Sequence, residues 1–212
     1  MQSVPNPPDQ PKPSKKASKI LDAATQEFLK HGYAGATIDQ IAATAAVSKP
    51  TVYSHFRNKE ELFSVLIEQL AKEKYRTIFQ VDDPQAFHAE PRIVLRRVLT
   101  AFFDVAGGDP DFVAFMRLII GESGRFPEIV QPYLRNIAKP ALETMSQYLM
   151  SCPELNLTDP DATARIVIGS VVHYFLLQEV LHGKSVIPLE RDRLLDSLIE
   201  LIVNAEQHNH PE

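Results

Sequence analysis

Apolar residues recur along this chain at the spacing of α-helices, and they never alternate with polar residues over a length that would make a strand. The first such stretch places Ile20, Leu21, Ala24 and Phe28 on one helix face. Proline and glycine residues separate the later stretches. The pattern predicts an all-α protein with nine helices, at residues 18–31, 38–45, 49–56, 59–79, 90–106, 110–123, 127–150, 159–182 and 189–206.

Residues with helix-capping chemistry stand at the ends of the first four predicted helices. Gly32 can adopt the left-handed conformation that often ends a helix. Thr37 and Gln40 have the spacing of a capping box. Ser48 and Asn58 are expected to accept hydrogen bonds from the first amides of the third and fourth helices.

The second and third helices, joined by about three residues, have the form of a helix-turn-helix. At about 100° per residue, Val52 and Phe56 point the same way along the third helix. The opposite face carries Pro50, Thr51 and Ser54. Such short side chains allow a helix to enter the DNA major groove, and a threonine methyl group can touch thymine.

The edges of this face carry groups that can bind phosphates, namely Lys49, Tyr53 and His55. Lys59 and the free amides at the start of the fourth helix are expected to form a second phosphate clamp. Three short helices with small residues between them also occur in bundles that bind no DNA. The pattern alone therefore leaves DNA binding and a purely structural role open.

The run from Thr37 to Leu62, TIDQIAATAAVSKPTVYSHFRNKEEL, resembles the DNA-binding region of the TetR family of repressors. The resemblance covers about residues 17–70. It implies a homodimer with two recognition helices in successive major grooves of operator DNA, and a C-terminal domain that binds an inducer. It also implies that Thr37 touches a phosphate, that Lys49, Pro50, Thr51 and Ser54 face base edges, and that Tyr53, His55 and Lys59 hold the DNA backbone.

Two positions depart from the family pattern. Ala46 stands in the turn where the family generally has glycine, so a left-handed backbone there would cost about 1 kcal/mol. Ser54 stands where many members have a larger side chain, and base reading at that position is expected to be weak or mediated by water.

The chain is expected to divide into four segments. They are a disordered, basic, proline-rich arm (1–16), a helix-turn-helix DNA-binding domain (17–62), a ligand-binding and dimerisation domain (63–207) and a tail (208–212). The helix at 159–182 is apolar almost all round and must be covered on several sides. In the family the two final long helices pair with those of a second subunit, so we expect a homodimer through 159–182 and 189–206.

Aromatic, sulfur-bearing and polar residues in the middle helices are candidates for an inducer site. Each apolar one taken singly is more typical of core filling, whereas together they favour a lipophilic or aromatic ligand. The candidates are Phe102, Phe112, Phe115, Met116, Tyr133, Met145, Tyr148, His173, Tyr174 and Gln178. The string from Arg117 to Glu128 resembles a C-terminal subgroup of the family that contains regulators of multidrug efflux.

The charge of the chain at first argues against nucleic acid, since 22 Lys+Arg against 27 Asp+Glu give a formal net charge of -5. Residues 1–60, however, hold eight basic against five acidic residues, a balance of +3, and residues 61–212 hold -8. The basic end is the one that carries the helix-turn-helix. An acidic body is repelled by phosphates, which favours docking through the N-terminal domain alone.

Other function classes find little support in the sequence. The single cysteine, Cys152, excludes a disulfide framework and fits a reducing compartment, and no apolar stretch approaches the roughly 20 residues of a membrane span. No secretory signal is expected, so the chain is assigned to the cytoplasm. No nucleotide-binding or nucleophile motif is found, and Glu179 and His182 have no second pair to complete a metal site, so no enzyme, metal or cofactor is expected. A helical adaptor and a dimeric small-molecule-binding protein without DNA affinity remain as alternatives.

Overall fold

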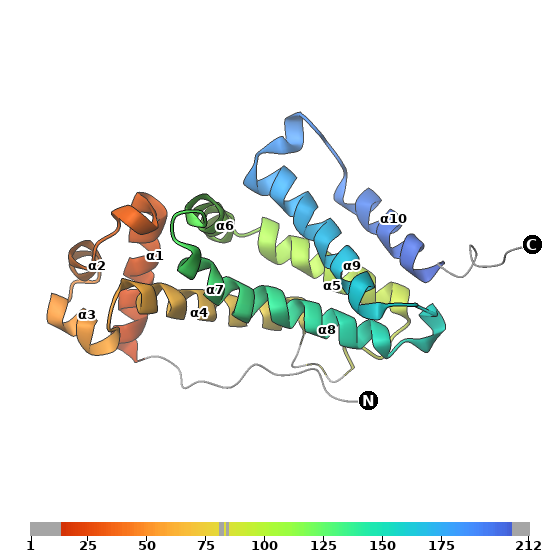
Figure 1. Ribbon diagram of the computed structural model, residues 1–212, viewed down its shortest axis with the longest axis horizontal. Helices are drawn as coiled ribbons and strands as arrows, with labels where there is room; N and C mark the ends of the chain where they lie inside the picture. The colour runs from red at the N-terminus through yellow and green to blue at the C-terminus, as the bar shows by residue number, and fades with distance from the viewer. Residues whose placement is uncertain (1–13, 81–82, 84, 205–212) are drawn as a thin grey trace, which may run out of the picture. The chain divides into compact units, whose positions relative to one another are not determined.

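The computed structural model describes residues 14–80, 83 and 85–204, and throughout that part the regular structure is helical, without strands (Figure 1). The predicted arm and tail therefore lie almost entirely outside the described residues. The α-helices are α1 (Lys15–Gly35), α2 (Ile38–Thr44), α3 (Lys49–His55), α4 (Lys59–Phe79), α5 (Pro91–Gly107), α6 (Pro110–Glu122), α7 (Val130–Tyr133), α8 (Lys139–Met150), α9 (Pro160–Phe175) and α10 (Arg191–Val203). The all-α prediction is confirmed.

The helix predicted at 127–150 is interrupted in its hydrogen-bond register. A 3₁₀ turn (Pro127–Ile129), α7, a π-helical segment (Leu134–Ala138) and α8 follow one another there. The widened register comes directly before Pro140, which has no N–H to donate to the preceding turn. A second π segment (Leu176–Val180) extends α9 to nearly the predicted end.

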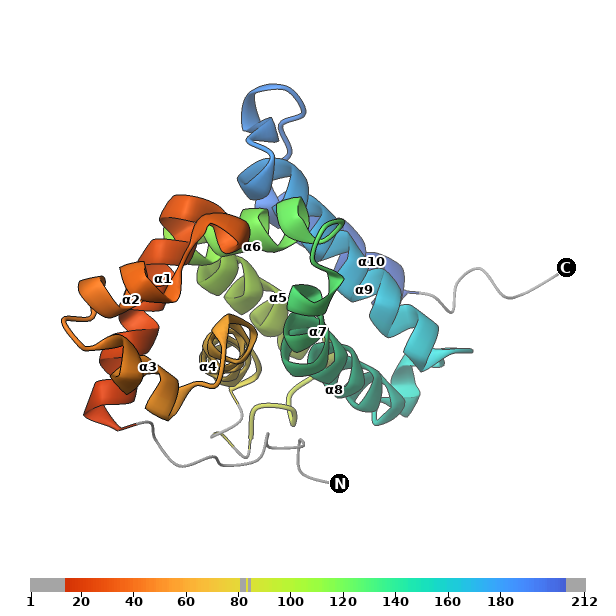
Figure 2. The ribbon, with the colours of Figure 1, turned by 60° about the vertical axis from the view of Figure 1, so that its left-hand side comes forward.

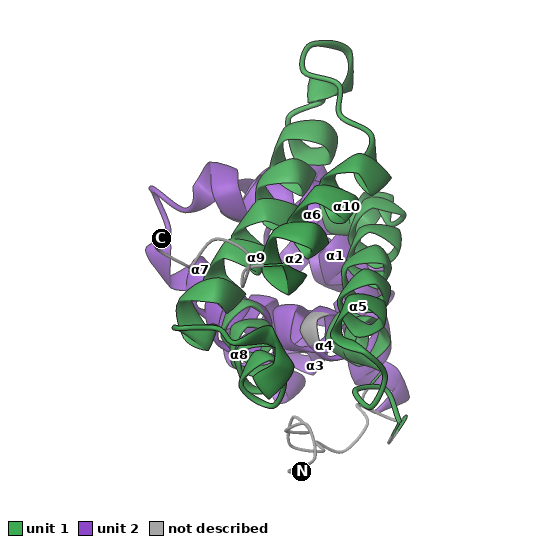
Figure 3. Cartoon of the chain, turned by 90° about the vertical axis from the view of Figure 1, so that its right-hand side faces the viewer, with its two compact units in different colours: residues 1–6, 73–113, 138–212 green, residues 7–72, 114–137 purple. Residues whose placement is uncertain are grey.

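The chain forms two compact units, and within the described residues each contains two stretches of sequence (Figure 3). The N-terminal unit comprises the described residues up to Lys72 together with 114–137, and the C-terminal unit comprises 73–113 and 138–204. The division therefore falls within α4 and α6, whereas the sequence suggested one boundary between residues 62 and 63. The second half of α6 and all of α7 thus belong with the helix-turn-helix.

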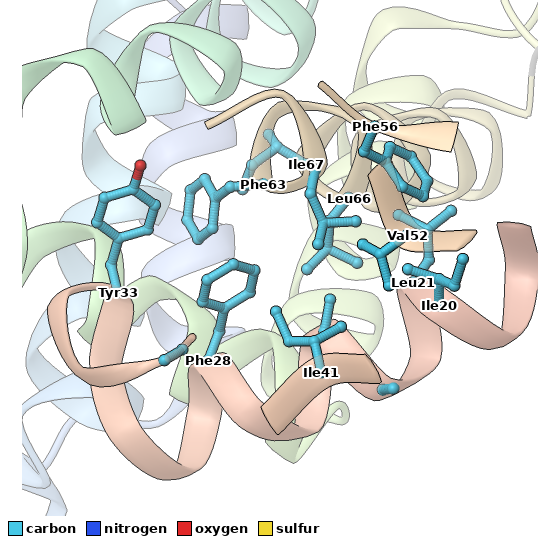
Figure 4. Close-up of a cluster of buried hydrophobic side chains, with 14 of the residues drawn as sticks. Ile20, Leu21, Phe28, Tyr33, Ile41, Val52, Phe56, Phe63, Leu66 and Ile67 are labelled. Atoms are coloured by element: carbon cyan, nitrogen blue, oxygen red, sulfur yellow. The ribbon is translucent and has the colours of Figure 1, made fainter. Parts of the chain in front are cut away.

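Four aromatic rings pack together in the core of the N-terminal unit, and Figure 4 labels three of them, Phe28, Tyr33 and Phe63. Phe63 of α4 meets Phe28 and Tyr33 of α1 edge to face, each at 5.1 Å between ring centroids. Phe115 of α6 stacks on the same Phe63 ring at 5.3 Å. Ile41 of α2 and Val52 of α3 are fully buried in the same core, so residues of α1, α4 and α6 hold the helix-turn-helix in place.

The predicted N-terminal caps of α2, α3 and α4 are all present. Thr37 accepts from the Gln40 amide while Gln40 Oε1 accepts from the Thr37 N–H, which completes the capping box. Ser48 accepts from the Thr51 amide, and Asn58 Oδ1 accepts from the Glu61 amide at 2.8 Å. Local sequence thus determines where α2, α3 and α4 begin.

Gly32 interrupts α1 with φ +73°, so the prediction that the first helix ends there is partly right: one further turn follows before Ala36. A Cβ at Gly32 would lie 3.0 Å from Glu122 Oε1, which comes from the end of α6. Glycine is favoured at this position by its φ of +73° and ψ of 170°, whereas the carboxylate is the end of a flexible side chain that can move.

The turn between α2 and α3 contains Ala46 with φ +51°, in the left-handed region. An L-residue with a Cβ is disfavoured there by roughly 1–2 kcal/mol, partly offset because glycine loses more chain entropy on folding. We therefore expect Ala46→Gly to raise the free energy of unfolding by about 1 kcal/mol, measured by urea denaturation. Ala43→Gly, at an exposed position inside the helical part of α2, is the control and should lower stability by a similar amount, about 0.5–1 kcal/mol. Destabilisation by Ala46→Gly would contradict the left-handed turn.

The C-terminal unit has its own core, built by α5, α8, α9 and α10 with the second half of α4. Its fully buried residues include Val94, Leu95, Ala164, Val167, Val171, Leu195 and Ile199. Two polar contacts tie α4 into this unit. Tyr75 and Thr144 share a hydroxyl–hydroxyl hydrogen bond of 2.5 Å, and Lys74 pairs with Asp109 at 2.5 Å.

In the described part of the chain, none of the helices has the length and apolar character needed to cross a bilayer.

Candidate nucleic-acid interface

Helix α3 is amphipathic, and the side that packs in the core is the one that the sequence predicted. Val52 is fully buried and Phe56, directly after the helix, is 5% exposed, so this side seats α3 in the core. Figure 2 shows α3 beside α2 and α1 at the surface of the N-terminal unit. The exposed residues of α3 are Lys49, Pro50, Tyr53, Ser54 and His55, and Thr51 is half-buried. All of the predicted base-facing and flanking residues of α3 therefore lie on its accessible side or at its margin.

Hydrogen bonds within α3 decide what its hydroxyl groups can offer. The Thr51 and Ser48 hydroxyls are 2.8 Å apart, so the threonine oxygen is engaged at the cap and its methyl group is left for apolar contact. Ser54 donates its proton to the Thr51 carbonyl at 2.8 Å. Its oxygen can then only accept, which suits the amino groups of adenine or cytosine in the major groove.

Thr37 lies exposed at the start of α2, where the resemblance puts a phosphate contact. Its hydroxyl lies 2.7 Å from Gln40 Oε1, to which it donates. Contact with a phosphate as donor therefore requires the hydroxyl to exchange this intramolecular bond.

Lys49 is held by an acidic residue that sequence analysis did not single out. Its Nζ lies 2.9 Å from Oδ2 of Asp39 on α2. The hydrogen bond from Lys49 to Asp39 and their attraction raise the pKa of the lysine above its ordinary value. In the sequence, Asp39 and Lys49 are only two opposite charges ten residues apart. They come into contact because the turn folds α3 back against α2.

The structure leads us to revise the role of Lys59 from phosphate contact to positioning. Its ammonium donates to the carbonyls of Tyr33 at 2.8 Å and Ala36 at 3.2 Å, and it lies 3.5 Å from that of Ala34. The same ammonium lies 4.6 Å from the centre of the Tyr33 ring. An ammonium group has three N–H donors. The carbonyl groups of the turn between α1 and α2 take up the donors that a phosphate would need.

Arg57 is a further cation that the sequence reading left out. It follows α3 directly, and its side chain is 89% exposed. Its Nε lies 3.6 Å from Glu61 Oε1, and its backbone amide donates to Glu61 Oε2 at 2.6 Å. Arg57 therefore offers a phosphate-binding group at the end of α3, where sequence analysis had looked to Lys59.

A buried carboxylate connects α1 to α2. Glu27, 8% exposed, accepts from the Thr44 hydroxyl at 2.7 Å and lies 3.4 Å from His31 Nε2. The sequence shows these residues only as polar positions, because their meeting depends on how the two helices cross.

The ten candidates for the inducer site divide between the two units. Phe115, Met116 and Tyr133 belong to the N-terminal unit, and the stacking of Phe115 on Phe63 makes it a core residue there. Met145 and Tyr148 are buried in the core of the C-terminal unit. The ten candidates are therefore distributed over both compact units.

Another group of aromatic residues does come together in the C-terminal unit. Phe102 lies 5.4 Å from Phe103 and 6.1 Å from Phe175, while Tyr174 lies 5.0 Å from Phe103. Phe112 lies 6.0 Å from Phe175. Phe102 and Tyr174 are half-buried, so part of this aromatic group is accessible.

The polar candidates serve the connection between α9 and α10. The Tyr174 hydroxyl donates to the Leu189 carbonyl at 2.8 Å, and the Gln178 amide donates to the Ile187 carbonyl at 2.9 Å. His173 is exposed on α9. Tyr174 and Gln178 therefore hold residues 187–189 in place.

A short amphipathic helix that packs on a helical core and presents a polar face has the form of the recognition helix of a helix-turn-helix DNA-binding domain. Residues 20–66 match the model of the TetR family of bacterial regulatory proteins, and residues 93–205 match that of the AefR-like transcriptional repressor C-terminal domain. The chain belongs to the TetR family and is a transcriptional regulator with a helix-turn-helix DNA-binding domain. This is a family of regulators, not of enzymes.

Known proteins resemble the chain over different lengths. The HTH-type transcriptional regulator YhgD of Bacillus subtilis is 38% identical over 81 residues, which are 38% of this chain and 42% of YhgD. The chain thus aligns with less than half the length of that relative. Two solved structures have the same fold. A TetR-family regulator of Mesorhizobium loti has a TM-score of 0.74 at 22% identity, covering 92% of this chain and 98% of its own. FadR of Bacillus subtilis, in complex with stearoyl-CoA, has a TM-score of 0.65 at 20% identity, covering 88% and 97%.

Proposed function

We propose that this regulator represses transcription as a homodimer on a pseudo-palindromic operator and is released by a small lipophilic or aromatic molecule. The observation that carries the DNA part is the division of α3. Val52 and Phe56 pack in the core and hold the helix there. The opposite face of α3 carries the small side chains of Pro50, Thr51 and Ser54. A protein that binds chromosomal operators acts in the bacterial cytoplasm, where we place it.

Exposed apolar side chains on the last two helices support the homodimer. Ile166 of α9 is 62% exposed and Leu201 of α10 is 74% exposed. A Cβ at Gly169, on the same helix as Ile166, would meet no described atom within 4 Å, so a second helix can approach closely there. Sedimentation at micromolar concentration should give a dimer, and a purely monomeric species would contradict this part of the proposal.

The accessible aromatic group of the C-terminal unit supports the class of inducer. Phe102 and Tyr174 can contact an apolar or aromatic ligand beside the buried rings of Phe103 and Phe175. The stearoyl-CoA bound by FadR is consistent with a lipophilic ligand for this fold. Because linkage is reciprocal, an inducer that lowers operator affinity must bind the DNA complex more weakly by the same factor.

The experiment is selection of binding sites from random duplex DNA, followed by titration with the selected duplex. We expect two-fold symmetric half-sites about one helical turn apart or slightly more. Thr51→Ala removes the methyl contact and should cost about 1–3 kcal/mol of operator binding with little change on a scrambled duplex.

The matched control is Thr77→Ala, which removes the same atoms from an exposed position of α4 and should leave both affinities unchanged. Failure to enrich any sequence would favour a helical adaptor or a small-molecule-binding dimer instead. Equal losses for both variants would contradict the assignment of α3 as the recognition helix.

A further inference from the structure

The ion pair between Asp39 and Lys49 lies at the edge of the recognition helix. Asp39 is in the first turn of α2, and Lys49 is the first residue of α3. The side chains are 69% and 48% exposed, and their charged atoms are 2.9 Å apart. An exposed pair of this kind contributes little to stability. Its larger consequence is therefore the charge that the helix presents to DNA.

A lysine without a partner in this place would increase attraction to the phosphates of any DNA sequence. Asp39 offsets that charge and restricts the flexible lysine side chain. One of the three ammonium N–H donors goes to Asp39, and two remain. Two directed donors suit the O6 and N7 acceptors of guanine, while the unused carboxylate acceptors of Asp39 suit the amino group of its cytosine partner.

We propose that Asp39 is a specificity-determining residue: it orients Lys49 toward a G·C base pair of the operator and suppresses the binding of Lys49 to phosphates of other sequences. This inference rests on the proposed DNA binding. It concerns a residue that belongs to α2, outside the face of α3 that the helix-turn-helix pattern identifies. It requires one conserved G·C pair in each half-site selected by the wild-type protein.

The test is Asp39→Asn, which keeps the size of the side chain and removes its charge. Affinities for the selected operator and for a scrambled duplex of the same composition are measured by fluorescence anisotropy between 50 and 200 mM salt. One additional phosphate contact steepens the salt slope by about 0.9, which is roughly a 3.5-fold additional loss of affinity over that range. We expect this steepening on the scrambled duplex, a smaller ratio of specific to non-specific affinity, and loss of the G·C preference in a repeated selection.

Two comparisons make the result specific to this pair. Asp22→Asn removes the same charge from an exposed position of α1 that forms no ion pair within the described residues, and it should leave the salt slope unchanged. In a Lys49→Met background, Asp39→Asn should no longer steepen the slope. Equal effects of the two asparagine variants, or an undiminished effect without Lys49, would overturn the inference while DNA binding stands. Absence of any DNA binding by the wild-type protein would overturn both proposals.

Discussion

Phe63→Ala is expected to cost about 3–5 kcal/mol of the free energy of unfolding, the largest effect of any single substitution considered for this protein. The ring is 1% exposed and contacts aromatic rings from α1 and α6. Its removal leaves a cavity and also deletes aromatic pairs that contribute about 0.5–1.5 kcal/mol each. Because domains are stable by only about 5–15 kcal/mol, this loss is a large fraction of the stability that holds α2 and α3 in place.

The measurement is urea denaturation followed by far-ultraviolet circular dichroism. Tyr53→Ala is the control for stability, since it removes a ring of similar size that is 48% exposed on α3. That variant should stay within about 0.5 kcal/mol of the wild type. Equal denaturation midpoints for the two variants would show that Phe63 does not join α1, α4 and α6.

Lys59→Met is expected to lower stability by about 1–3 kcal/mol, because it leaves buried or half-buried carbonyl groups of the α1–α2 turn without a donor. The turn leads directly into Thr37, the cap of α2, so operator affinity should fall as well. The salt dependence of DNA binding should not change, since the ammonium contacts the turn. A lysine that contacts a phosphate would instead reduce the salt slope by about 0.9 on removal.

Lys30→Met is the matched control, because Lys30 is an exposed cation of α1 in the same unit. It removes the same charge and should leave stability within about 0.5 kcal/mol. A reduced salt slope for Lys59→Met, with stability equal to that of Lys30→Met, would restore the phosphate role that the sequence suggested.

Much of the local structure could be predicted because it depends on residues close together in the chain. The capping box of Thr37 and Gln40 and the caps Ser48 and Asn58 each require only a side chain and an amide three residues away. The buried side of α3 follows from helical periodicity, which places Val52 and Phe56 together. The two π segments were not predictable from spacing, because apolar periodicity does not report a one-residue change of register.

The candidate site was predicted in composition but not in its contacts. The face of α3 was found correctly from its spacing. The partners of its charged residues were missed, because Asp39 is ten residues before Lys49 and the turn that Lys59 contacts is more than twenty residues before it. The distribution of the aromatic candidates over two compact units was also not predictable, because sequence records residue type without position in space.

The sequence by itself determined the helices, their caps and the family, since each depends on short-range periodicity, side-chain chemistry and a characteristic string of residues. The tertiary structure alone decided that residues 114–137 join the helix-turn-helix unit, because that grouping arises from the packing of Phe115 on Phe63 across 52 positions of sequence. It also decided that Ala46 adopts a left-handed backbone and that Lys59 faces inward. These properties depend on which segments pack against one another in space, and the spacing of residues along the sequence does not specify that packing.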